Sequence, residues 1–374
     1  MASEMTTTVI GDGRRFSVGE AAVADRSDWD ALVASLPSGD PLQAWGWGEA
    51  IASGGRERPV RLLVRDGQGH PRGVAQILVR PTAFGRRVLY LPHGPTWDAA
   101  APDCDAVLDT LIEGIRTIGR KERGIVAKLD LRATPELPAD LLAGMLRDGG
   151  LRRARYGLQA RTTRLLDLTI GTDALCAALE KDTRNAIRRA AKEGVVTRVV
   201  RDADPSPYAT FAVLLAAMGA RAGIRVRSAD FLGRLAAAFA PAGSAYLVLA
   251  DHQDRTIAGC LALTTGMRAF YIYAGSLRDS ALRHTFGSYA TLWTLCRALA
   301  ADGRTSLDLW GVSEPGDPDA DPRWEGYSLF KRGFGGTQLR HPGVFDLILD
   351  PFWYWVRDWR ERLASRPPAI ARST

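Results

Sequence analysis

The sequence has little of what metal, redox and covalent enzymes place at their active sites. Its four cysteines are scattered without a CxxC pair, at Cys104, Cys176, Cys260 and Cys296. No HExxH, GxSxG or GxxxxGK[ST] pattern occurs, and no GxGxxG follows an apolar strand run. These absences predict reduced thiols, no bound metal and no cofactor. The chemistry would then depend on positioning and electrostatics.

Long hydrophobic runs are also missing. No window reaches about 18 uninterrupted apolar residues, and the start, MASEMTTTVIGDGRR, lacks the apolar core of a signal peptide. The chain has 374 residues, of which 46% are hydrophobic, so it can bury one large core or two smaller ones. We therefore expect a cytoplasmic protein, more plausibly of two domains than of one.

Lysine is the scarcest charged residue. Among 49 basic residues, lysine occupies only positions 121, 128, 181, 192 and 331. The net charge of +7 favours a polyanionic partner, such as RNA, nucleotide phosphates or an anionic membrane face. A composition rich in alanine and arginine also follows from genome base composition, so both explanations stay open.

The segment 172–193 is predicted to form one helix, because Gly194 supplies a C-terminal stop. Its cations are Lys181, Arg184, Arg188, Arg189 and Lys192. Such a density exceeds what solubility needs and favours contact with phosphate or RNA. A solvated helix face is the alternative.

Two stretches repeat the same order of predicted elements. Residues 60–131 and 245–313 each read as strand, hairpin, strand, strand, helix and strand. The spacing Arg-x-x-Tyr-x-x-x-Gly recurs 181 residues apart, at Tyr90 and at Tyr271. This order predicts an α/β protein with two mixed sheets, each flanked by helices.

The stretch YSLFKRGFGG, residues 327–336, places the rare Lys331 ahead of a glycine-rich turn. A compact ammonium reaches the base of a narrow cleft that a planar guanidinium does not enter. Glycines beside it would let the backbone approach a ligand. Lys331 is therefore predicted to bind a phosphate or a developing oxyanion. An ordinary surface lysine before a turn is the alternative.

Six stretches together carry a family resemblance. They are LQAWGWGEA (42–50), EKDTRNAIRRAAKEGV (180–195), YIYAGS (271–276), LDLWGVSEP (307–315), WEGYSLFKRGFGG (324–336) and GVFDLILDP (343–351), and the Gly-Pro turn in HGPTWD (93–98) is a further match. In these stretches the chain resembles the peptidoglycan bridge-forming aminoacyltransferases of the FemA/FemB/FemX family, abbreviated FemABX. The resemblance covers most of the chain from about residue 40.

The resemblance implies two tandem GNAT-like domains. The first would comprise residues 1–160 and 343–374, because in the family the C-terminal segment returns to complete it. The second would comprise residues 161–342. The chain has no room for a coiled-coil arm between Gly194 and Phe211, so it resembles the short, arm-free FemX type.

The implied reaction moves an aminoacyl group from aminoacyl-tRNA to the stem peptide of a UDP-linked or lipid-linked muramyl-pentapeptide. Lys331 matches the family's active-site lysine, and Arg227 matches an arginine that holds the diphosphate of the precursor. Other implied substrate positions are Trp47, Asp130, Tyr271 and Asp346. The implied contacts with the tRNA donor are Lys181, Arg184, Arg188 and Lys192.

Two positions depart from the family pattern, and both concern the acceptor. A lysine expected shortly after the stretch at 42–50 is missing, and Arg56 and Arg58 are the nearest cations, of which Arg56 would replace the lost charge. A tyrosine expected four residues after Arg227 is Phe231, which donates no hydrogen bond.

Two other acyl transfers remain alternatives. Aminoacyl transfer to a peptide natural product would account for the altered acceptor positions. A GNAT-type N-acyltransferase would use acetyl-CoA, but the nearest pyrophosphate loop, RHTFGS at 283–288, lacks the first glycine of that motif.

The C-terminal stretch DPFWYWVRDWRERL has an aromatic stripe at helical spacing. Its members are Phe352, Trp355, Val356, Trp359 and Leu363. We expect this stripe to pack against its own domain, with peripheral contact to a membrane interface as the alternative.

Overall fold

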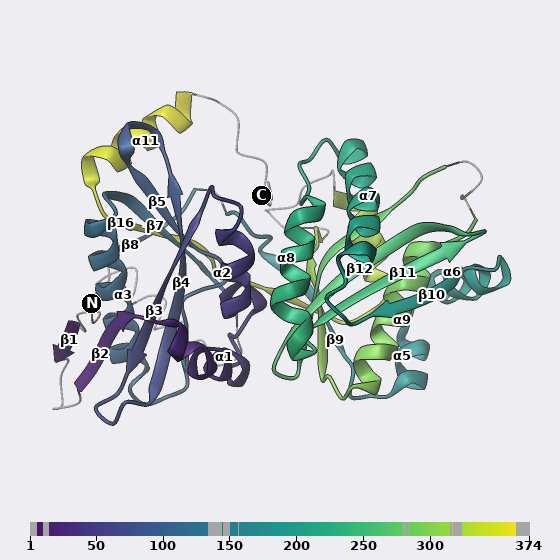
Figure 1. Cartoon of the computed structure of the whole chain (residues 1–374), viewed down its shortest axis with the longest axis horizontal. Helices are drawn as coiled ribbons and strands as arrows, with labels where there is room; N and C mark the ends of the chain where they lie inside the picture. Colours follow the sequence, from purple (N-terminus) through teal and green to yellow (C-terminus); the bar gives the residue numbers. More distant parts are fainter. Residues whose placement is uncertain are drawn as a thin grey trace. The chain divides into compact units, whose positions relative to one another are not determined.

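The computed structural model describes residues 6–9, 15–133, 144, 150–155, 157–279, 282, 284–314, 316 and 324–363. These residues form two compact units, divided in the chain between Gln159 and Ala160 and again between Arg340 and His341. Unit 1 holds the two outer segments and unit 2 the segment between them. Each unit is built on one twisted mixed sheet with helices on its faces (Figure 1). The predicted α/β class with two mixed sheets is confirmed.

The sheet of unit 1 has the order β1-β2-β3-β4-β5-β7-β16-β8, with β6 paired to β4. Its strands are β1 (Thr6–Val9), β2 (Arg15–Glu20), β3 (Arg58–Arg65), β4 (Pro71–Pro81), β5 (Arg87–Leu91), β6 (Thr96–Trp97), β7 (Gly124–Leu131), β8 (Leu151–Arg153) and β16 (Gly343–Ile348). Its helices are α1 (Arg26–Ser35), α2 (Trp45–Ala52), α3 (Cys104–Lys121) and α11 (Pro351–Leu363), with 3-10 turns at Val23–Asp25, Pro41–Gln43 and Ala83–Gly85.

Alternation along β3 explains how this sheet is covered on both faces. Val60, Leu62 and Val64 join the core under α3, whereas Leu63 belongs to a separate cluster with Trp29 of α1. Successive side chains of a strand point to opposite faces, so one strand contributes to both layers. Near the C-terminus, Trp353 and Tyr354 of α11 pack on a third cluster from β5 and β7.

The sheet of unit 2 has the order β10-β11-β12-β13-β14-β9-β15. Its strands are β9 (Thr162–Asp167), β10 (Val196–Val200), β11 (Ala245–His252), β12 (Arg255–Thr265), β13 (Arg268–Ser276), β14 (Ser306–Gly311) and β15 (Thr337–Arg340). Its helices are α5 (Thr172–Ala178), α6 (Lys181–Lys192), α7 (Pro205–Ala222), α8 (Ala229–Phe239), α9 (Gly287–Ala301) and α10 (Glu325–Arg332), with a 3-10 turn at Ala240–Ala242.

The core of unit 2 lies mainly between α9 and the central strands. Leu292, Leu295 and Leu299 of α9 pack on β11 and β12 residues such as Tyr246 and Cys260. The α7 helix contacts β12 and β13 and pairs with α8. In the described part of the chain the longest helices, α3 and α7, have 18 residues each, and no coiled-coil arm occurs.

The predicted repeat of elements is confirmed. Each unit contains two antiparallel steps, β3-β4-β5 and β11-β12-β13. A helix, α3 or α9, then leads to a strand that pairs in parallel, as β5 with β7 and β13 with β14. A parallel pair needs such a crossover connection, so the order of strand, helix and strand fixes the polarity of both sheets.

The single helix predicted for residues 172–193 is wrong, because the structure has two helices there. Leu179 and Glu180 are extended, with ψ angles of 146° and 151°, and they separate α5 from α6. Leu179 is buried in the core of unit 2. Inserting this side chain requires a break that no propensity or capping signal in the sequence indicates.

The packing predicted for the C-terminal aromatic stripe is also wrong for its aromatic members. Phe352, Trp355 and Trp359 are exposed, and α11 instead packs through Trp353 and Tyr354. Among the described residues, no helix has both the length and the apolar character needed to cross a membrane.

Close approach of α7 to β13 predicts a selective cost at Gly275. A Cβ on Gly275 would lie 2.7 Å from the backbone carbon of Leu214, and backbone cannot rotate away. We expect Gly275→Ala to lower the free energy of unfolding by about 1–3 kcal/mol. In Gly233→Ala on α8 the new Cβ would lie 3.9 Å from Pro205 Cβ, an ordinary van der Waals contact. That control should raise the free energy of unfolding by about 0.5–1 kcal/mol. Urea titration measures both, and equal effects would contradict the tight approach.

Candidate active site

In unit 2, β13 and β14 pair only over a short stretch. The pairing joins residues 268–270 of β13 to residues 306–308 of β14. Beyond it, β13 continues to Ser276 and β14 to Gly311. The ends of these strands therefore have backbone groups available for other partners, and Gly311 is one of them.

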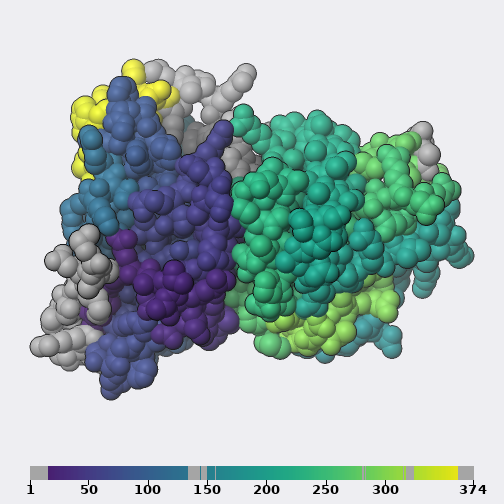
Figure 2. Space-filling model, in the orientation of Figure 1, coloured from purple at the N-terminus to yellow at the C-terminus, as the bar shows by residue number. Residues whose placement is uncertain are grey.

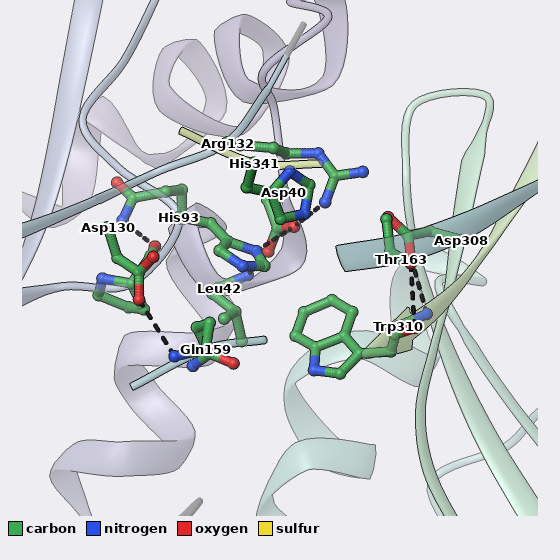
Figure 3. A network of polar contacts seen from close by, with 12 residues as sticks. Asp40, Leu42, His93, Asp130, Arg132, Gln159, Thr163, Asp308, Trp310 and His341 are labelled. Carbon is green, nitrogen blue, oxygen red and sulfur yellow. Dashed lines mark hydrogen bonds and ion pairs between the residues drawn. The ribbon is translucent and has the colours of Figure 1, made fainter. Parts of the chain in front are cut away.

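A buried aspartate fixes the end of β14. Asp308 accepts a hydrogen bond from the Trp310 backbone N–H (2.7 Å) and contacts the Thr163 hydroxyl of β9 (Figure 3). Trp310 has a φ of 62°, in the left-handed region that bulky residues rarely occupy. Its ring lies edge-on to Phe270, with 6.3 Å between ring centroids. Asp308 therefore stabilises a kink just before Gly311.

Lys331 reaches this kinked strand end from α10. The side chain is 1% exposed, and its Nζ donates a hydrogen bond to the Gly311 carbonyl oxygen at 2.8 Å. The Tyr327 ring centroid, one helical turn earlier, lies 4.0 Å from Nζ, and that of Tyr271 on β13 lies 5.8 Å away. Aromatic faces at these distances stabilise a cation. The structure thus brings together two of the predicted site residues, Lys331 and Tyr271.

The ammonium of Lys331 is only weakly compensated. Burial lowers the pKa of its ammonium well below the ordinary value, and the negative charge of Asp308 offsets this only in part. Its hydrogen-bond acceptor is a backbone carbonyl rather than a carboxylate. Keeping a weakly compensated charge in the interior is costly, and perturbed groups of this kind cluster at functional sites. The alternative of a surface lysine is excluded by its burial.

The glycine-rich turn that follows α10 packs against elements of unit 2 itself. A Cβ on Gly333 would lie 2.2 Å from Thr183 Oγ1 of α6, and one on Gly336 would lie 2.5 Å from the Leu165 carbonyl oxygen of β9. The Gly333 carbonyl oxygen accepts a hydrogen bond from Glu180 N at 2.9 Å. The close approach predicted for a ligand is therefore made here by α6 and β9, which tie the turn to the start of the cationic helix.

The four predicted donor-binding cations of α6 do not share one environment. Lys181, Arg188 and Lys192 are exposed and follow one stripe of the helix. Arg184 is half-buried, and its guanidinium donates hydrogen bonds to the carbonyl oxygens of Ala177 (3.0 Å) and Leu179. Arg184 thus satisfies the C-terminal carbonyls of α5, while the other three face solvent.

Arg227 lies just before α8 and is half-buried. Its Nε donates a hydrogen bond to the Tyr273 hydroxyl at 3.2 Å, and its guanidinium carbon lies 4.2 Å from the Phe231 ring centroid. The aromatic ring that departs from the family pattern therefore supports Arg227 by stacking instead of by a hydrogen bond.

Unit 1 holds a second buried polar group at the ends of β5 and β7. Asp130 accepts hydrogen bonds from the Tyr90 hydroxyl (3.0 Å) and from Gln159 N (3.2 Å). The Gln159 amide also donates to the Tyr90 oxygen at 3.1 Å. Burial raises the pKa of the Asp130 carboxyl, and the charge of His93 offsets this in part. A buried carboxyl with a raised pKa can accept or release a proton nearer neutral pH than an exposed one.

His93 belongs to an ion-paired cluster behind Asp130. Its Nδ1 lies 2.8 Å from Asp40 Oδ2, which also accepts a hydrogen bond from Arg132 at 3.0 Å (Figure 3). Burial alone would raise the pKa of Asp40, but His93 and Arg132 reverse this and hold it below its ordinary value. Burial opposes protonation of His93, yet Asp40 raises its pKa above the usual range. The cluster therefore stabilises an imidazolium close to Asp130.

The remaining predicted residues of unit 1 lie apart from this cluster. Asp346 on β16 accepts hydrogen bonds from Lys128 Nζ (2.7 Å) and from the Tyr354 hydroxyl (3.0 Å), so it joins the sheet to α11. Trp47 is buried within α2, and Arg56 is exposed in the turn that follows α2. Arg58, the other candidate, forms a salt bridge with Glu122 at 2.5 Å.

Several site residues escape the sequence analysis. Asp308 lies within LDLWGVSEP, one of the stretches that resemble the family. Tyr90 occupies the position in the first repeat that Tyr271 occupies in the second. The sequence therefore contains a signal for both residues. Arg164 gives no such signal. It donates hydrogen bonds to the carbonyl oxygens of Gly335 (2.9 Å) and Gly336 (2.8 Å), and it pairs with Glu314 at 2.8 Å.

The lowered pKa of Lys331 predicts a pH-dependent stability. Between the folded-state pKa and the unfolded value of 10.5, the unfolded chain binds the extra proton, so stability rises with pH across this window. Each pH unit within it contributes up to about 1.4 kcal/mol. We expect wild type to gain stability relative to Lys331→Met as the pH rises toward the unfolded value of 10.5, measured by urea titrations at several pH values. The exposed control Lys121→Met should show no such pH-dependent difference from wild type in the free energy of unfolding. A difference between wild type and Lys331→Met that stays constant with pH would contradict the assignment.

Comparisons with known proteins agree with this architecture. Residues 177–324 match the model of a GNAT acetyltransferase domain. The chain is 22% identical to the lipid II:glycine glycyltransferase of Staphylococcus aureus over 92% of its own length and 96% of that protein. Its fold is similar to that of FemX, with a TM-score of 0.77, 20% identity and coverage of 88% of this chain and 98% of FemX.

A second solved structure shows the same tandem fold. A tandem GNAT protein from the clavulanic acid biosynthesis pathway is 14% identical, with a TM-score of 0.52 and coverage of 94% of this chain and 99% of that one. The quoted motifs, the nearly full-length similarity and the duplicated GNAT-like sheets agree with one another. The chain is similar to the FemABX protein lipid II:glycine glycyltransferase along nearly its whole length, and it shares the fold of FemX.

Proposed function

We propose that this protein transfers an aminoacyl group from aminoacyl-tRNA to an amino group on the stem peptide of a peptidoglycan precursor. The observation that carries the proposal is the buried Lys331 at the kinked end of β14 in a GNAT-like sheet. The nearly full-length similarity to a glycyltransferase that acts on lipid II supports the class of acceptor. Charged tRNA is a cytoplasmic donor, so we place the reaction in the cytoplasm.

The reaction needs no cofactor, because the aminoacyl ester of tRNA is already activated. The acceptor nitrogen attacks the ester carbonyl, a C–N bond forms, and the C–O bond to the ribose breaks. The ribose oxygen takes up a proton and the attacking nitrogen loses one, so the products are an amide and free tRNA. Catalysis then requires alignment of the substrates, a deprotonated amine and a stabilised oxyanion.

Lys331 suits the oxyanion step. Its ammonium is held in a dry, aromatic setting, where a hydrogen bond to developing negative charge is stronger than in water. Because the pKa of Lys331 is lowered, it lies closer to the pKa of a carbonyl or phosphate oxygen that takes up charge. Within unit 1, Asp130 has a raised pKa, so its carboxyl can accept or release a proton nearer neutral pH than an exposed one.

The donor and acceptor sides are assigned to different surfaces of unit 2. Lys181, Arg188 and Lys192 would contact tRNA phosphates, and α6 is joined to the turn after Lys331 by the bond from Glu180 N to Gly333 O. Arg227 would bind the diphosphate of a UDP-linked or lipid-linked precursor, because a guanidinium fork matches phosphate oxygens.

Loss of Lys331 should abolish transfer without unfolding the protein. We expect Lys331→Met to lower kcat/KM at least about a hundredfold, as is typical when an oxyanion donor is removed. The assay follows radiolabelled Gly, Ala or Ser from charged tRNA to UDP-linked or lipid-linked muramyl-pentapeptide. Lys121→Met is the matched control and should transfer at the wild-type rate. Undiminished transfer by Lys331→Met would remove Lys331 from the site while leaving the reaction intact.

The exposed stripe of α6 should set the salt dependence of donor binding. We expect Arg188→Gln/Lys192→Gln to weaken binding of charged tRNA and to lower the slope of log K against log salt by roughly 1.5–2. Filter binding between low and moderate salt measures this slope. Neutralising Arg120 and Lys121 on α3 removes the same charge elsewhere and should change the slope far less. Equal slopes for the two double variants would contradict a local tRNA contact.

Acetyl-CoA-dependent acylation is the second candidate, and one cavity favours it. A cavity of about 520 Å³ lies at the start of α9 and is lined by Ser276, Arg278, Phe286 and Ser288, among others. Arg283 of the incomplete pyrophosphate pattern lies outside the described residues. Acyl transfer from acetyl-CoA, with none from charged tRNA, would favour this candidate. Transfer from charged tRNA only to peptides unrelated to cell-wall precursors would favour a natural-product acceptor.

A further inference from the structure

Unit 1 carries an exposed aromatic surface that the proposed reaction does not use. Its members, which we call the α11 aromatic patch, are Phe84, Phe352, Trp355 and Trp359, with exposed fractions of 71%, 64%, 62% and 52%. Phe84 lies at the tip of the β4–β5 hairpin, and the other three lie on α11. Figure 2 shows α11, in yellow, on the outer surface of its unit.

The patch is continuous. The rings of Phe84 and Trp353 have centroids 5.4 Å apart, and those of Trp353 and Phe352 are 5.7 Å apart. Trp355 and Trp359 follow Phe352 at the helical spacings i+3 and i+7, which places all three on one face of α11. Trp353, packed on the core below, therefore connects the hairpin tip to the helix.

The fold gives no reason for this exposure. α11 is already anchored through Trp353 and Tyr354, so the patch adds no burial to the core. Phe84 has a φ of 58°, which is unfavourable for an aromatic residue, and it presents its ring to solvent at that cost. Contiguous exposed apolar surface of this kind marks an interaction site.

The two segments that carry the patch are rich in arginine. Arg123 Nη1 lies 4.0 Å from where a Cβ would stand on Gly85, beside Phe84. Arg86 pairs with Asp350 at 3.0 Å, and its guanidinium lies 5.1 Å from the Trp353 ring centroid. The region considered is the hairpin tip, the neighbouring Arg123 and α11 as far as residue 360. It contains five arginines and two aspartates. They are Arg86, Arg87, Arg123, Arg357 and Arg360 against Asp350 and Asp358.

We propose that the α11 aromatic patch docks the protein onto the surface of an anionic phospholipid bilayer. Aromatic side chains favour the boundary between headgroups and acyl chains, and arginines pair with lipid phosphates. The helix has 13 residues and charges on its flanks, so it lies in the interface and does not cross the bilayer. The combination of tryptophans with an excess of arginine is what selects a lipid surface over a neutral protein partner.

This inference stands apart from the proposed transfer reaction, because binding to lipid vesicles requires neither tRNA nor a peptide acceptor. If both hold, the protein works at the membrane face where a lipid-linked precursor is held. Failure of either one leaves the other intact.

The test measures sedimentation of the full chain with vesicles. The probes are vesicles of phosphatidylcholine alone and vesicles with about 30% phosphatidylglycerol, near physiological salt. We expect wild type to bind the anionic vesicles. The variant Trp355→Gln/Trp359→Gln should bind them with an affinity at least roughly tenfold lower. The matched control is Val23→Gln/Val213→Gln, which removes exposed apolar side chains elsewhere and should bind like wild type. Thermal unfolding checks that both variants are folded.

Three outcomes would overturn the proposal. One is no binding of wild type to anionic vesicles. Another is equal binding by wild type and the tryptophan variant, which would mean that the net positive charge of the protein alone causes the binding. The third is a wild-type dimer that the tryptophan variant dissociates, without vesicle binding, which would assign the patch to a second copy of the chain.

Discussion

The burial of one ammonium group organises unit 2 around its candidate site. Lys331 can be inside only because the pairing of β13 and β14 stops early and leaves the Gly311 carbonyl oxygen as its acceptor. That strand end is held in place by Asp308, the Thr163 hydroxyl and a left-handed Trp310. A buried polar group must have such partners, so the kink, the aromatic rings and the lysine form one dependent set.

The two units show what happens to a duplicated element when its surroundings differ. Tyr90 and Tyr271 occupy matching strands, and burial raises the pKa of both hydroxyls well above the ordinary value. In unit 1 the hydroxyl donates to Asp130, whereas in unit 2 the ring faces Lys331. The same scaffold therefore supports an acidic centre in one copy and a basic centre in the other.

Periodicity and turn residues were sufficient to predict the sheets, because strand, helix and strand in that order permit few topologies. The strand runs of the repeat and the helices α3 and α9 follow from apolar spacing alone. The break at Leu179 could not be predicted, since tertiary packing of one leucine overrides a good helical pattern. Exposure of Trp355 and Trp359 was not predicted for a related reason. Periodicity identifies an aromatic face on a helix, but it does not tell whether another part of the protein packs on that face. Burial of Lys331 was foreseen only through context, and its aromatic setting was not foreseen.

The order of the sheet in unit 2 also bears on whether a strand from another molecule can add to it. In the described sheet, β10 and β15 are the terminal strands, with five and four residues. Both carry an arginine, Arg198 on β10 and Arg340 on β15. Short edges with a fixed charge disfavour the addition of a strand from another molecule, because extending the ladder would bring like charges together. The exposed Val196 and Val199 on β10 make that protection matter most at this edge.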